Sequence, residues 1–534
     1  MGTLKVMDCT LRDGGYINDW NFGSRAIREI IKKLSLSGID YVEIGFMKDL
    51  PYDKNRTIFP GNDEAAGMIA PKNPGTLYFG MIDMGKPLPL EKLGKRREDS
   101  LDGIRVIFKK FKIQEGYDYC KKLTGLGYLV FAQLVGTDEY SDIELVETVQ
   151  KFNDLDILGL SIVDTFGLIK RKDFIRMASI IDHNLRPDIA LAYHSHNNLQ
   201  QAMGNASALV EMNLKRDVVI DGTVFGMGRG AGNLNMELFL NYLNDEFGRH
   251  YRIEPILEII DDYIYEIYNK ETWGYSLPFY LSATNGCHPN YAKYFAERGS
   301  LTVKAFNEIL RTIPSGTKEI YSKDEAEKIY ASFQENYIDD RQTLEKLEGQ
   351  LADKEILLLG SGRTLKAQKD DIGRFIAEHD PQVIALNFMP ESYHTDYIFS
   401  CNMRRYSKLQ DCTGVKKIVT SNVRDAQNYD YRINFSSYKI DNPEIIDNSG
   451  LMCIRFLIDL GVKDVYLAGI DGYSIDSDEN YVNSGLEYNF SLKSRKERNI
   501  LISQEIEKLN ENIGIHFITK SVYDEESRSK CKSI

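Results

Sequence analysis

Short apolar runs alternate with helix-like stretches through the first 250 residues. The helix-like stretches, such as SRAIREIIKKLSLSG, often end at glycine, as helix C-termini do. Eight of the apolar runs predict buried strands, at residues 4–9, 40–46, 76–82, 103–108, 128–135, 156–164, 188–194 and 217–224. Eight strands alternating with helices over ~245 residues favour a TIM (β/α)8 barrel, with a doubly wound open sheet as the alternative.

The pattern changes after residue 250. Residues 251–350 are rich in Tyr, Glu and Lys and predict a helical extension, which ends in a charged segment at 337–355. Further strands are predicted at 355–365, 383–388, 416–422 and 463–472. We therefore expect three parts, namely a barrel at 1–250, a helical extension with a candidate lid at 251–350, and a Rossmann-like α/β domain at 351–534.

Composition and charge narrow the classes of partner. The 534 residues are 43% hydrophobic and 27% charged, as in ordinary globular proteins. A net charge of -13 gives no general attraction to nucleic acid. No apolar run approaches the ~18–20 residues that span a bilayer, so no membrane partner is expected. Seven scattered cysteines without a CxxC pair predict reduced thiols and a cytoplasmic location.

Three polar motifs follow predicted strands of the barrel, namely TLRDG (10–14), HSHNN (194–198) and GMGRGAGN (226–233). Residues i and i+2 of a strand point the same way, so His194 and His196 can present two imidazoles to one side. In a closed barrel these strands are neighbours, which brings Asp13 and Asn233 within reach of the same ion. Two nitrogens and one or two oxygens suit Mn²⁺, Zn²⁺, Co²⁺ or Mg²⁺.

These motifs, together with VEIGF (42–46), resemble the DRE-TIM metallolyase family. The family includes 4-hydroxy-2-oxovalerate aldolase, 3-hydroxy-3-methylglutaryl-CoA lyase and isopropylmalate synthase, and the resemblance covers roughly residues 1–300. It is greatest for the aldolase branch. The resemblance implies that Asp13, His194 and His196 hold a divalent metal, Mn²⁺ first among the choices, with Asn233 as a possible further ligand.

The same resemblance implies roles in substrate binding. Arg12 would lie against the keto acid or an enolate oxygen, and Glu43 would support Arg12 or a metal-bound water. Asp164 and Thr165 would line the pocket. The implied reaction cleaves or forms a carbon–carbon bond of a 4-hydroxy-2-keto acid through a pyruvate enolate.

One position departs from the aldolase pattern. The branch has a histidine three residues after the metal aspartate, whereas this chain has Tyr16. A tyrosine with a pKa near 10 is a poor base at neutral pH. Either Tyr16 is tuned by the metal, a metal-bound hydroxide takes the proton, or His288 in NGCHPNY (285–291) does so. The aromatic stretch 273–295 predicts either a lid or a packing seam between helices.

The last predicted domain offers weaker signals. The turn in ILLLGSGRTL (356–365) can cradle a phosphate or can be a simple tight turn. Together with residues 395–406 and 467–473, it is faintly similar to transferases that use nucleotide sugars or CMP-sialic acid. Binding of a nucleotide or nucleotide sugar would then involve Ser361, Asn387, Asn402 and Asp471. The alternative is a domain for oligomerisation or for docking a partner.

The sequence thus predicts a metal-dependent aldolase that takes a small keto acid and is a homo-oligomer. Two other functions stay open. One is a Claisen-type acyl-CoA lyase or synthase, although no CoA-binding motif is visible. The other is a non-catalytic binding or scaffold protein, in which Tyr16 in place of the histidine would indicate that catalysis has been lost.

Overall fold

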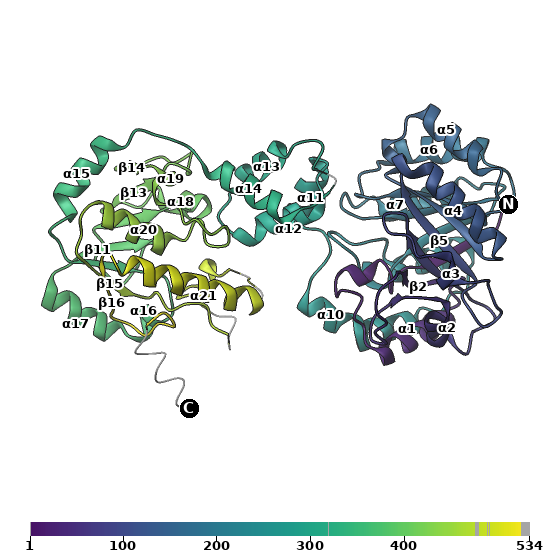
Figure 1. Cartoon of the computed structure of the whole chain (residues 1–534), viewed down its shortest axis with the longest axis horizontal. Helices are drawn as coiled ribbons and strands as arrows, with labels where there is room; N and C mark the ends of the chain where they lie inside the picture. The colour runs from purple at the N-terminus through teal and green to yellow at the C-terminus, as the bar shows by residue number, and fades with distance from the viewer. Residues whose placement is uncertain (1, 319, 476–479, 489, 491, 525–534) are drawn as a thin grey trace. The chain divides into compact units, whose positions relative to one another are not determined.

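The chain folds into two compact units, Met1–Asn290 and Tyr291–Ile534 (Figure 1). The computed structural model describes residues 2–318, 320–475, 480–488, 490 and 492–524. The expected division at residues 250 and 350 stays a prediction.

Eight parallel strands close into a barrel in the first unit. Their order is β1-β9-β8-β7-β6-β5-β4-β2, and β1 pairs with both β9 and β2. This closure excludes the open sheet, and all eight predicted strands are present. A short strand β3, which the sequence analysis missed, pairs with β2. The bounds are β1 Leu4–Asp8, β2 Tyr41–Met47, β3 Ile58–Phe59, β4 Leu77–Asp83, β5 Gly103–Lys109, β6 Leu129–Val135, β7 Gly159–Asp164, β8 Ala190–Ser195 and β9 Val218–Gly222.

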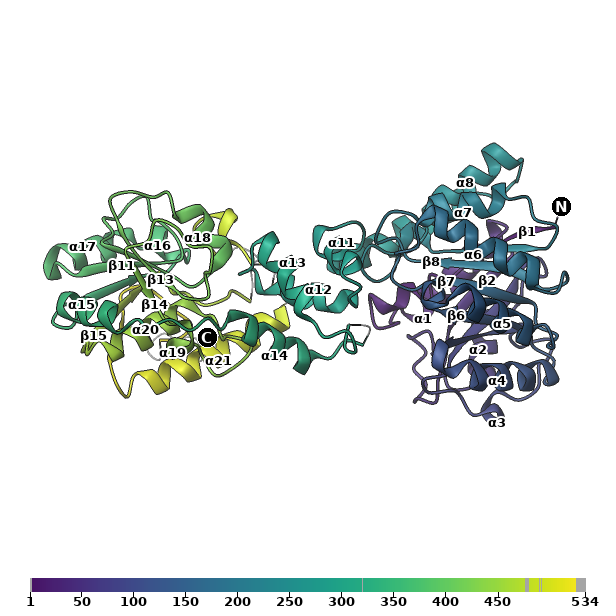
Figure 2. The same cartoon turned by 90° about the horizontal axis from the view of Figure 1, so that it is seen from above.

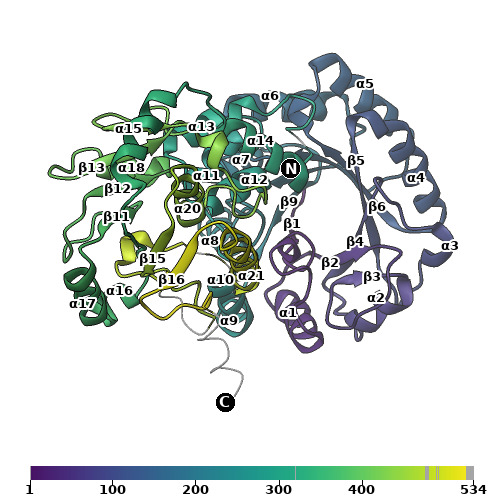
Figure 3. The ribbon, with the colours of Figure 1, turned by 60° about the vertical axis from the view of Figure 1, so that its left-hand side comes forward.

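Helices surround the barrel strands, as Figure 3 shows for α1 to α6. Helix α1 buries Ile27, Ile30 and Leu34, which recur at helical spacing, so one apolar stripe packs on the sheet. Helix α5 begins at a capping box of Ser141 and Glu144. The bounds are α1 Ser24–Leu36, α2 Asn62–Ile69, α3 Leu90–Leu93, α4 Ile113–Gly125, α5 Asp142–Phe152, α6 Arg171–Asn184, α7 Ala202–Glu211 and α8 Met236–Phe247.

The barrel interior is layered. Near the amino ends of the strands, the rings of Tyr41, Phe79 and Phe131 pack against one another. Further along the strands the interior turns polar, and four buried side chains replace the apolar ones, namely Glu43, Arg105, Gln133 and Asp221. The candidate site lies beyond this polar layer, at the carboxyl ends of the strands, where barrel enzymes carry their active sites.

The expected helical extension is present. Ile256, Ile259, Ile264 and Trp273 belong to the same buried cluster as the barrel core. The bounds are α9 Glu254–Ile259, a π-helix Ile260–Ile264, α10 Tyr265–Lys270, α11 Leu277–Thr284, α12 Pro289–Arg298, α13 Val303–Thr312, α14 Lys323–Gln334 and α15 Arg341–Leu351.

The second unit contains a seven-stranded parallel sheet of order β14-β13-β12-β11-β10-β15-β16. All four predicted strands are found, and β12, β14 and β16 were not expected. Figure 2 shows α17 and α18 on one face of the sheet and α20 and α21 on the other. The strands are β10 Ile356–Leu359, β11 Gln382–Leu386, β12 Tyr397–Ser400, β13 Lys416–Thr420, β14 Tyr431–Ile433, β15 Asp464–Ala468 and β16 Gly514–Phe517. The helices are α16 Thr364–Ala367, α17 Lys369–His379, α18 Met403–Leu409, α19 Phe435–Tyr438, α20 Ser449–Asp459 and α21 Leu492–Leu509.

The strand order of the second unit defines its fold class. The chain first adds strands on one side of β10 and then crosses to its other side with β15, which is the doubly wound, Rossmann-like arrangement. In addition, among the described residues no helix combines the length and apolar character needed to span a membrane.

Candidate metal centre

Three side chains meet at the carboxyl end of the barrel. Asp13 lies in the loop after β1, while His194 and His196 lie at the end of β8 and just beyond it. Oδ2 of Asp13 is 3.9 Å from Nε2 of His194 and 3.8 Å from Nε2 of His196. All three side chains are buried, and their ligand atoms are close enough together to hold one metal ion. The fold thus brings together the three residues that the sequence assigns to the metal.

The protonation states suit metal ligands. Burial raises the pKa of Asp13, but the interactions with Arg12 and with the two histidines outweigh it. The pKa of Asp13 therefore lies well below its ordinary value. Burial lowers the pKa of His196 to about 3, against the opposing charge of Asp13. At neutral pH the site therefore offers a carboxylate and a neutral imidazole, which are the forms that bind cations.

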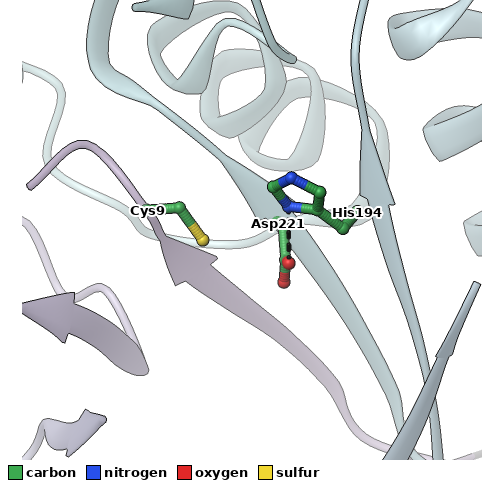
Figure 4. A group of neighbouring side chains, drawn as sticks. All are labelled: Cys9, His194 and Asp221. Carbon is green, nitrogen blue, oxygen red and sulfur yellow. Dashed lines mark hydrogen bonds and ion pairs between the residues drawn. The ribbon is translucent and has the colours of Figure 1, made fainter. Parts of the chain in front are cut away.

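Asp221 on β9 fixes the orientation of His194, as Figure 4 shows. Its Oδ2 lies 3.0 Å from Nδ1 of His194. If Nδ1 carries the proton, as a carboxylate partner requires, the lone pair of Nε2 faces Asp13. A carboxylate in this position makes an imidazole a stronger ligand.

Cys9, His194 and Asp221 form a second close group, but this group already has its cation. The buried guanidinium of Arg105 donates through Nη1 to Sγ of Cys9 at 3.1 Å and through Nη2 to Oδ2 of Asp221. Burial, reinforced by the charges of Asp221 and Glu43, raises the pKa of Cys9 well above its ordinary value. The thiol is therefore neutral, and we assign this group to support of the metal centre.

Arg12 is held from two sides at the edge of the centre. Its Nε donates to Oε2 of Glu43 at 2.7 Å, and its Nη1 donates to Oδ1 of Asp13 at 2.5 Å. The indole of Trp20 donates to the Arg12 carbonyl at 2.7 Å. Glu43 therefore contacts Arg12, which is one of the two roles expected for it. Oε1 of Glu43 is buried without a hydrogen-bond partner among the described residues.

The donor set favours a cation here. The buried carboxylates of Asp13, Glu43 and Asp221 contact the buried guanidiniums of Arg12 and Arg105. The carboxylate of Asp13 and the imidazoles of His194 and His196 also converge, with their ligand atoms within 4.8 Å of one another. One carboxylate oxygen and two imidazole nitrogens are ligands that divalent cations take, so the residues present fit such an ion.

Asn233 reaches the centre from the glycine-rich loop after β9. Its Nδ2 donates to Oδ2 of Asp13 at 2.7 Å, and its Oδ1 is buried without a partner among the described residues. A Cβ on Gly228 would lie 2.5 Å from Nδ2 of Asn233, and one on Gly232 would lie 2.1 Å from a backbone oxygen. The loop can therefore approach Asn233 only because these positions are glycine.

The two side-chain candidates for proton transfer, Tyr16 and His288, meet at Arg229, which lies in the same loop. The Arg229 guanidinium lies 3.9 Å from the centre of the Tyr16 ring, and its Nη1 is 3.5 Å from Nε2 of His288. Burial raises the pKa of Tyr16, with Arg229 opposing the shift. Burial and the charge of Arg229 lower the pKa of His288 to about 4. Both side chains are therefore uncharged at neutral pH.

Asp164 and Thr165 organise the loop that follows β7. Oδ1 of Asp164 accepts from the N–H of Leu168 at 2.8 Å, and Oγ1 of Thr165 accepts from the N–H of Gly136 at 2.8 Å. Burial raises the pKa of Asp164 to about 8. The contacts found are thus with backbone, and the expected contact with substrate stays a prediction.

The sequence analysis missed Arg105, Asp221 and Arg229. Arg105 and Asp221 are charged residues inside the apolar runs GIRVIF and DVVIDGTV, and this is the signal that marks them. A charge inside a buried strand needs a partner, so both runs predict an internal ion pair. Arg229 gives no comparable signal, because its neighbours depend on the path of a glycine-rich loop.

The four residues expected to form a pocket in the second unit do line one cavity, namely Ser361, Asn387, Asn402 and Asp471. The glycine turn is the tight turn rather than an open phosphate cradle. The N–H groups of Gly360 and Gly362 donate to the carbonyls of Ala468 and Gly469, both at 2.8 Å.

Comparisons with known proteins agree with this geometry. Residues 130–254 match the model of the HMGL-like family. Oxaloacetate decarboxylase of Mycobacterium tuberculosis is 26% identical over 232 residues, which are 43% of this chain and 67% of that protein. 2-Isopropylmalate synthase of Methylacidiphilum infernorum is 25% identical over 46% of this chain and 50% of that protein. 4-Hydroxy-2-oxovalerate aldolase of Moorella thermoacetica is 22% identical over 50% of this chain and 78% of that protein.

Among solved structures, the N-terminal domain of a proposed aldolase from Bacteroides vulgatus is similar. It is 24% identical, with a TM-score of 0.47, over 55% of this chain and 96% of that chain. The relatives named above match half to about three quarters of their own lengths. Taken with the closed barrel and its candidate metal centre, the matches show that this chain carries an HMGL-like (DRE-TIM) domain, followed by a C-terminal region that lies beyond it.

Proposed function

We propose that the barrel is a divalent-metal-dependent aldolase that cleaves or forms a carbon–carbon bond of a 4-hydroxy-2-keto acid through a pyruvate enolate. The observation that carries the proposal is the buried cluster of Asp13, His194 and His196 beside the guanidinium of Arg12. The similarity to 4-hydroxy-2-oxovalerate aldolases supports the same reaction.

Asp13, His194 and His196 would hold the metal, with Asn233 as a further contact. A bound divalent cation supplies Lewis-acid polarisation of the substrate's keto group. We propose Mn²⁺ as the native ion, because nitrogen and carboxylate ligands in this ratio suit it.

Arg12 stabilises the negative charge that develops on the enolate oxygen. Its position is fixed by Glu43 and Asp13, so it needs little reorganisation during the reaction. A charged guanidinium also gives a stronger hydrogen bond than a neutral donor. Since burial surrounds this pair with little water, the interaction is less screened than at the surface.

Tyr16 and His288 have different roles at the proton-transfer position. The raised pKa of Tyr16 keeps its hydroxyl protonated, so it acts as a hydrogen-bond donor to the substrate and not as a base. An imidazole that is neutral at neutral pH can act as a base, and His288 takes the proton of the 4-hydroxyl in the cleavage direction. Arg229 contacts both side chains and holds them together.

The test is release of pyruvate from 4-hydroxy-2-oxovalerate and its longer homologues by the metal-loaded full chain. Asp13→Asn and His194→Ala should abolish release and bound metal together. His183→Ala, at an exposed position of helix α6, is the matched control and should keep both. Metal content is measured on each protein by elemental analysis. Full metal occupancy with no pyruvate from any 4-hydroxy-2-keto acid would contradict the aldolase proposal.

Two further assays identify the alternatives if aldolase activity is missing. Release of free CoA thiol from an acyl-CoA mixed with a 2-keto acid would point to synthase chemistry, and cleavage of a 3-hydroxyacyl-CoA to a shorter acyl-CoA would point to lyase chemistry. Failure to bind any metal would instead favour the non-catalytic scaffold. A cytoplasmic location and a homo-oligomer are also proposed; fractionation of cells and light scattering of the purified chain test them.

A further inference from the structure

The cavity in the second unit lies where an open parallel sheet binds its ligand. β10 and β15 are neighbours, and the chain order reverses between them. In doubly wound sheets the crevice at the carboxyl ends of such strands is the binding position. A cavity of about 170 Å³ occupies this place, lined by Ser361 after β10 and Asp471 after β15.

The usual phosphate position at this crevice is already filled. Asp471 accepts from the N–H of Thr364 at 2.8 Å and also from its hydroxyl, so a carboxylate occupies the start of α16. A Cβ on Gly362 would meet Asp471 at 2.5 Å, and one on Gly360 would meet the Gly469 carbonyl at 2.4 Å. The glycines therefore let two loops pack together, and an anionic group of a ligand must bind elsewhere.

Two of the arginines around the small cavity share one carboxylate. Arg298 and Arg498 both contact Glu444, at 3.5 and 3.1 Å. Arg405 has no carboxylate partner among the described residues. Its guanidinium lies 4.8 Å from the Tyr488 ring centre, and it donates to the Leu486 carbonyl at 2.7 Å. The small cavity is thus lined on this side by an aromatic ring and a guanidinium that packs on it.

Amide groups and rings line the rest of the small cavity. Asn387 is 6% exposed, with a φ of 61°, and its Oδ1 accepts from Oγ of Ser400 at 2.7 Å. Its Nδ2 has only the Cys401 sulfur, 4.0 Å away, as a partner among the described residues. The stacked rings of Tyr488 and Phe490 lie 5.4 Å apart. A buried amide with a spare donor beside stacked rings is suited to a planar heteroaromatic group.

A second cavity of about 530 Å³ adjoins the first and shares Asn387, Arg405 and Tyr488 with it. This volume falls in the ~300–1,000 Å³ range of small-molecule sites. Its cationic lining residues are Lys366, Lys369, Arg404, Arg405 and Lys408. The described structure gives none of the five an ion pair, although the whole chain has a net charge of -13.

We propose that these two cavities form one nucleotide site. The base lies in the small cavity against Tyr488 and the Asn387 amide, and the phosphates extend into the larger cavity toward Lys366 and Lys369. Five cations against the two carboxylates of the larger cavity, Glu391 and Glu487, leave its lining with an excess of positive charge that attracts an anion. The shared lining residues place the two cavities side by side, within reach of one extended ligand. The site is separate from the barrel centre and does not depend on the aldolase proposal. Free nucleotides and nucleotide sugars share the chemistry that it recognises.

Calorimetric titration of the full chain tests the site with ADP, UDP, CMP, a UDP-sugar and inorganic pyrophosphate. We expect at least one nucleotide to bind at least tenfold more tightly than pyrophosphate. The UDP and UDP-sugar arms show whether an attached sugar adds affinity. Absence of binding for every nucleotide at millimolar concentration, or equal binding of pyrophosphate, would overturn the proposal.

Matched variants locate the binding. Lys366→Gln with Lys369→Gln should weaken nucleotide binding roughly tenfold, because two charge-assisted contacts to phosphate are lost. Lys346→Gln with Lys354→Gln makes the same charge change elsewhere on the second unit and should have no effect. Tyr488→Leu should weaken nucleotide binding but not pyrophosphate binding. Circular dichroism verifies that each variant is folded.

A barrel variant completes the test. Asp13→Asn should leave nucleotide affinity unchanged, because the proposed site lies wholly in the second unit. Loss of binding in a folded Asp13→Asn variant would place the nucleotide in the barrel, and full retention in the Lys366 and Lys369 variant would show that the phosphates do not bind these lysines. Either result would refute the inference.

Discussion

The barrel centre and the proposed nucleotide site both lie at the carboxyl ends of parallel strands, yet their charged residues are arranged in opposite ways. In the barrel, buried Arg105 contacts Glu43 and Asp221 beneath the metal residues. In the second unit, the cations at the cavity, such as Lys366 and Lys369, are exposed and unpaired among the described residues.

This difference teaches how each site is tuned. A buried network holds ligands such as His194 in one orientation at all times, and it must stay complete because each buried charge depends on the others. An exposed set of lysines costs the fold little and attracts anions through water. We therefore expect changes in the barrel network to affect folding and geometry, and changes at the cavity to affect binding alone.

The largest expected effect is on stability, from Arg105→Gln. The variant leaves the carboxylates of Glu43 and Asp221 buried without their cation, which should cost about 3–5 kcal/mol. Both tryptophans, Trp20 and Trp273, lie in the first unit, so their fluorescence during urea unfolding reports on the barrel. Lys366→Gln is the control and should stay within about 0.5 kcal/mol of the parent. Equal effects of the two changes would break the comparison.

The next effect is on metal affinity, from Asp221→Asn. The amide no longer orients and polarises His194, so the dissociation constant for the metal should rise roughly 10–100-fold. Competition with a chelating dye measures this constant. Asp156→Asn, at an exposed position, should leave it unchanged. An unaltered affinity in Asp221→Asn would mean that Asp221 serves only to balance the charge of Arg105.

The pH dependence of stability tests the burial of Asp164. Burial raises the pKa of its carboxyl to about 8 in the folded chain, whereas the unfolded value is near 3.9. Between these values the unfolded chain has released the proton while the folded chain keeps it, so this group's contribution to stability falls as the pH rises from about 4 to 8. Asp164→Asn removes that dependence. The urea midpoint of Asp164→Asn, relative to that of the parent, should therefore be higher at pH 8.0 than at pH 5.5. An equal difference between variant and parent at both pH values would refute the argument.

The smallest effect comes from salt. Raising the ionic strength from about 50 to about 300 mM should weaken nucleotide binding several-fold, because the lysines of the cavity are exposed and screened. Metal binding inside the barrel should change less, since buried charges are screened less. Parallel titrations of both ligands measure the two slopes. Equal slopes would show that the two sites are neutralised alike.

The local pattern of apolar residues predicted much of the fold, because strands of a buried parallel sheet appear in the sequence as continuous apolar runs. All eight barrel strands were expected, and so were β10, β11, β13 and β15. The missed strands β3, β12, β14 and β16 are two to four residues long, and such runs give little periodic signal. The proximity of Asp13, His194 and His196 was also expected, because strand ends of a closed barrel converge.

The residues that were missed act across the barrel. Arg105 is 116 residues from Asp221 in the chain, and no local pattern indicates that the two meet. Arg229 lies over Tyr16 only because the glycine-rich loop turns back toward β1. For the same reason the turn at Gly360 and Gly362 was compatible with a phosphate cradle, until the contact with Asp471 showed how its groups are used.

The sequence by itself determined where the strands and helices form and which polar residues follow the strands, since both depend on neighbours a few positions apart. The tertiary structure alone decided which charged residues form ion pairs. It also decided which backbone N–H groups, such as those of Gly360 and Gly362, are bonded within the protein. Those outcomes depend on distances between residues far apart in the chain, and electrostatic and hydrogen-bond energies are set by these distances and by burial.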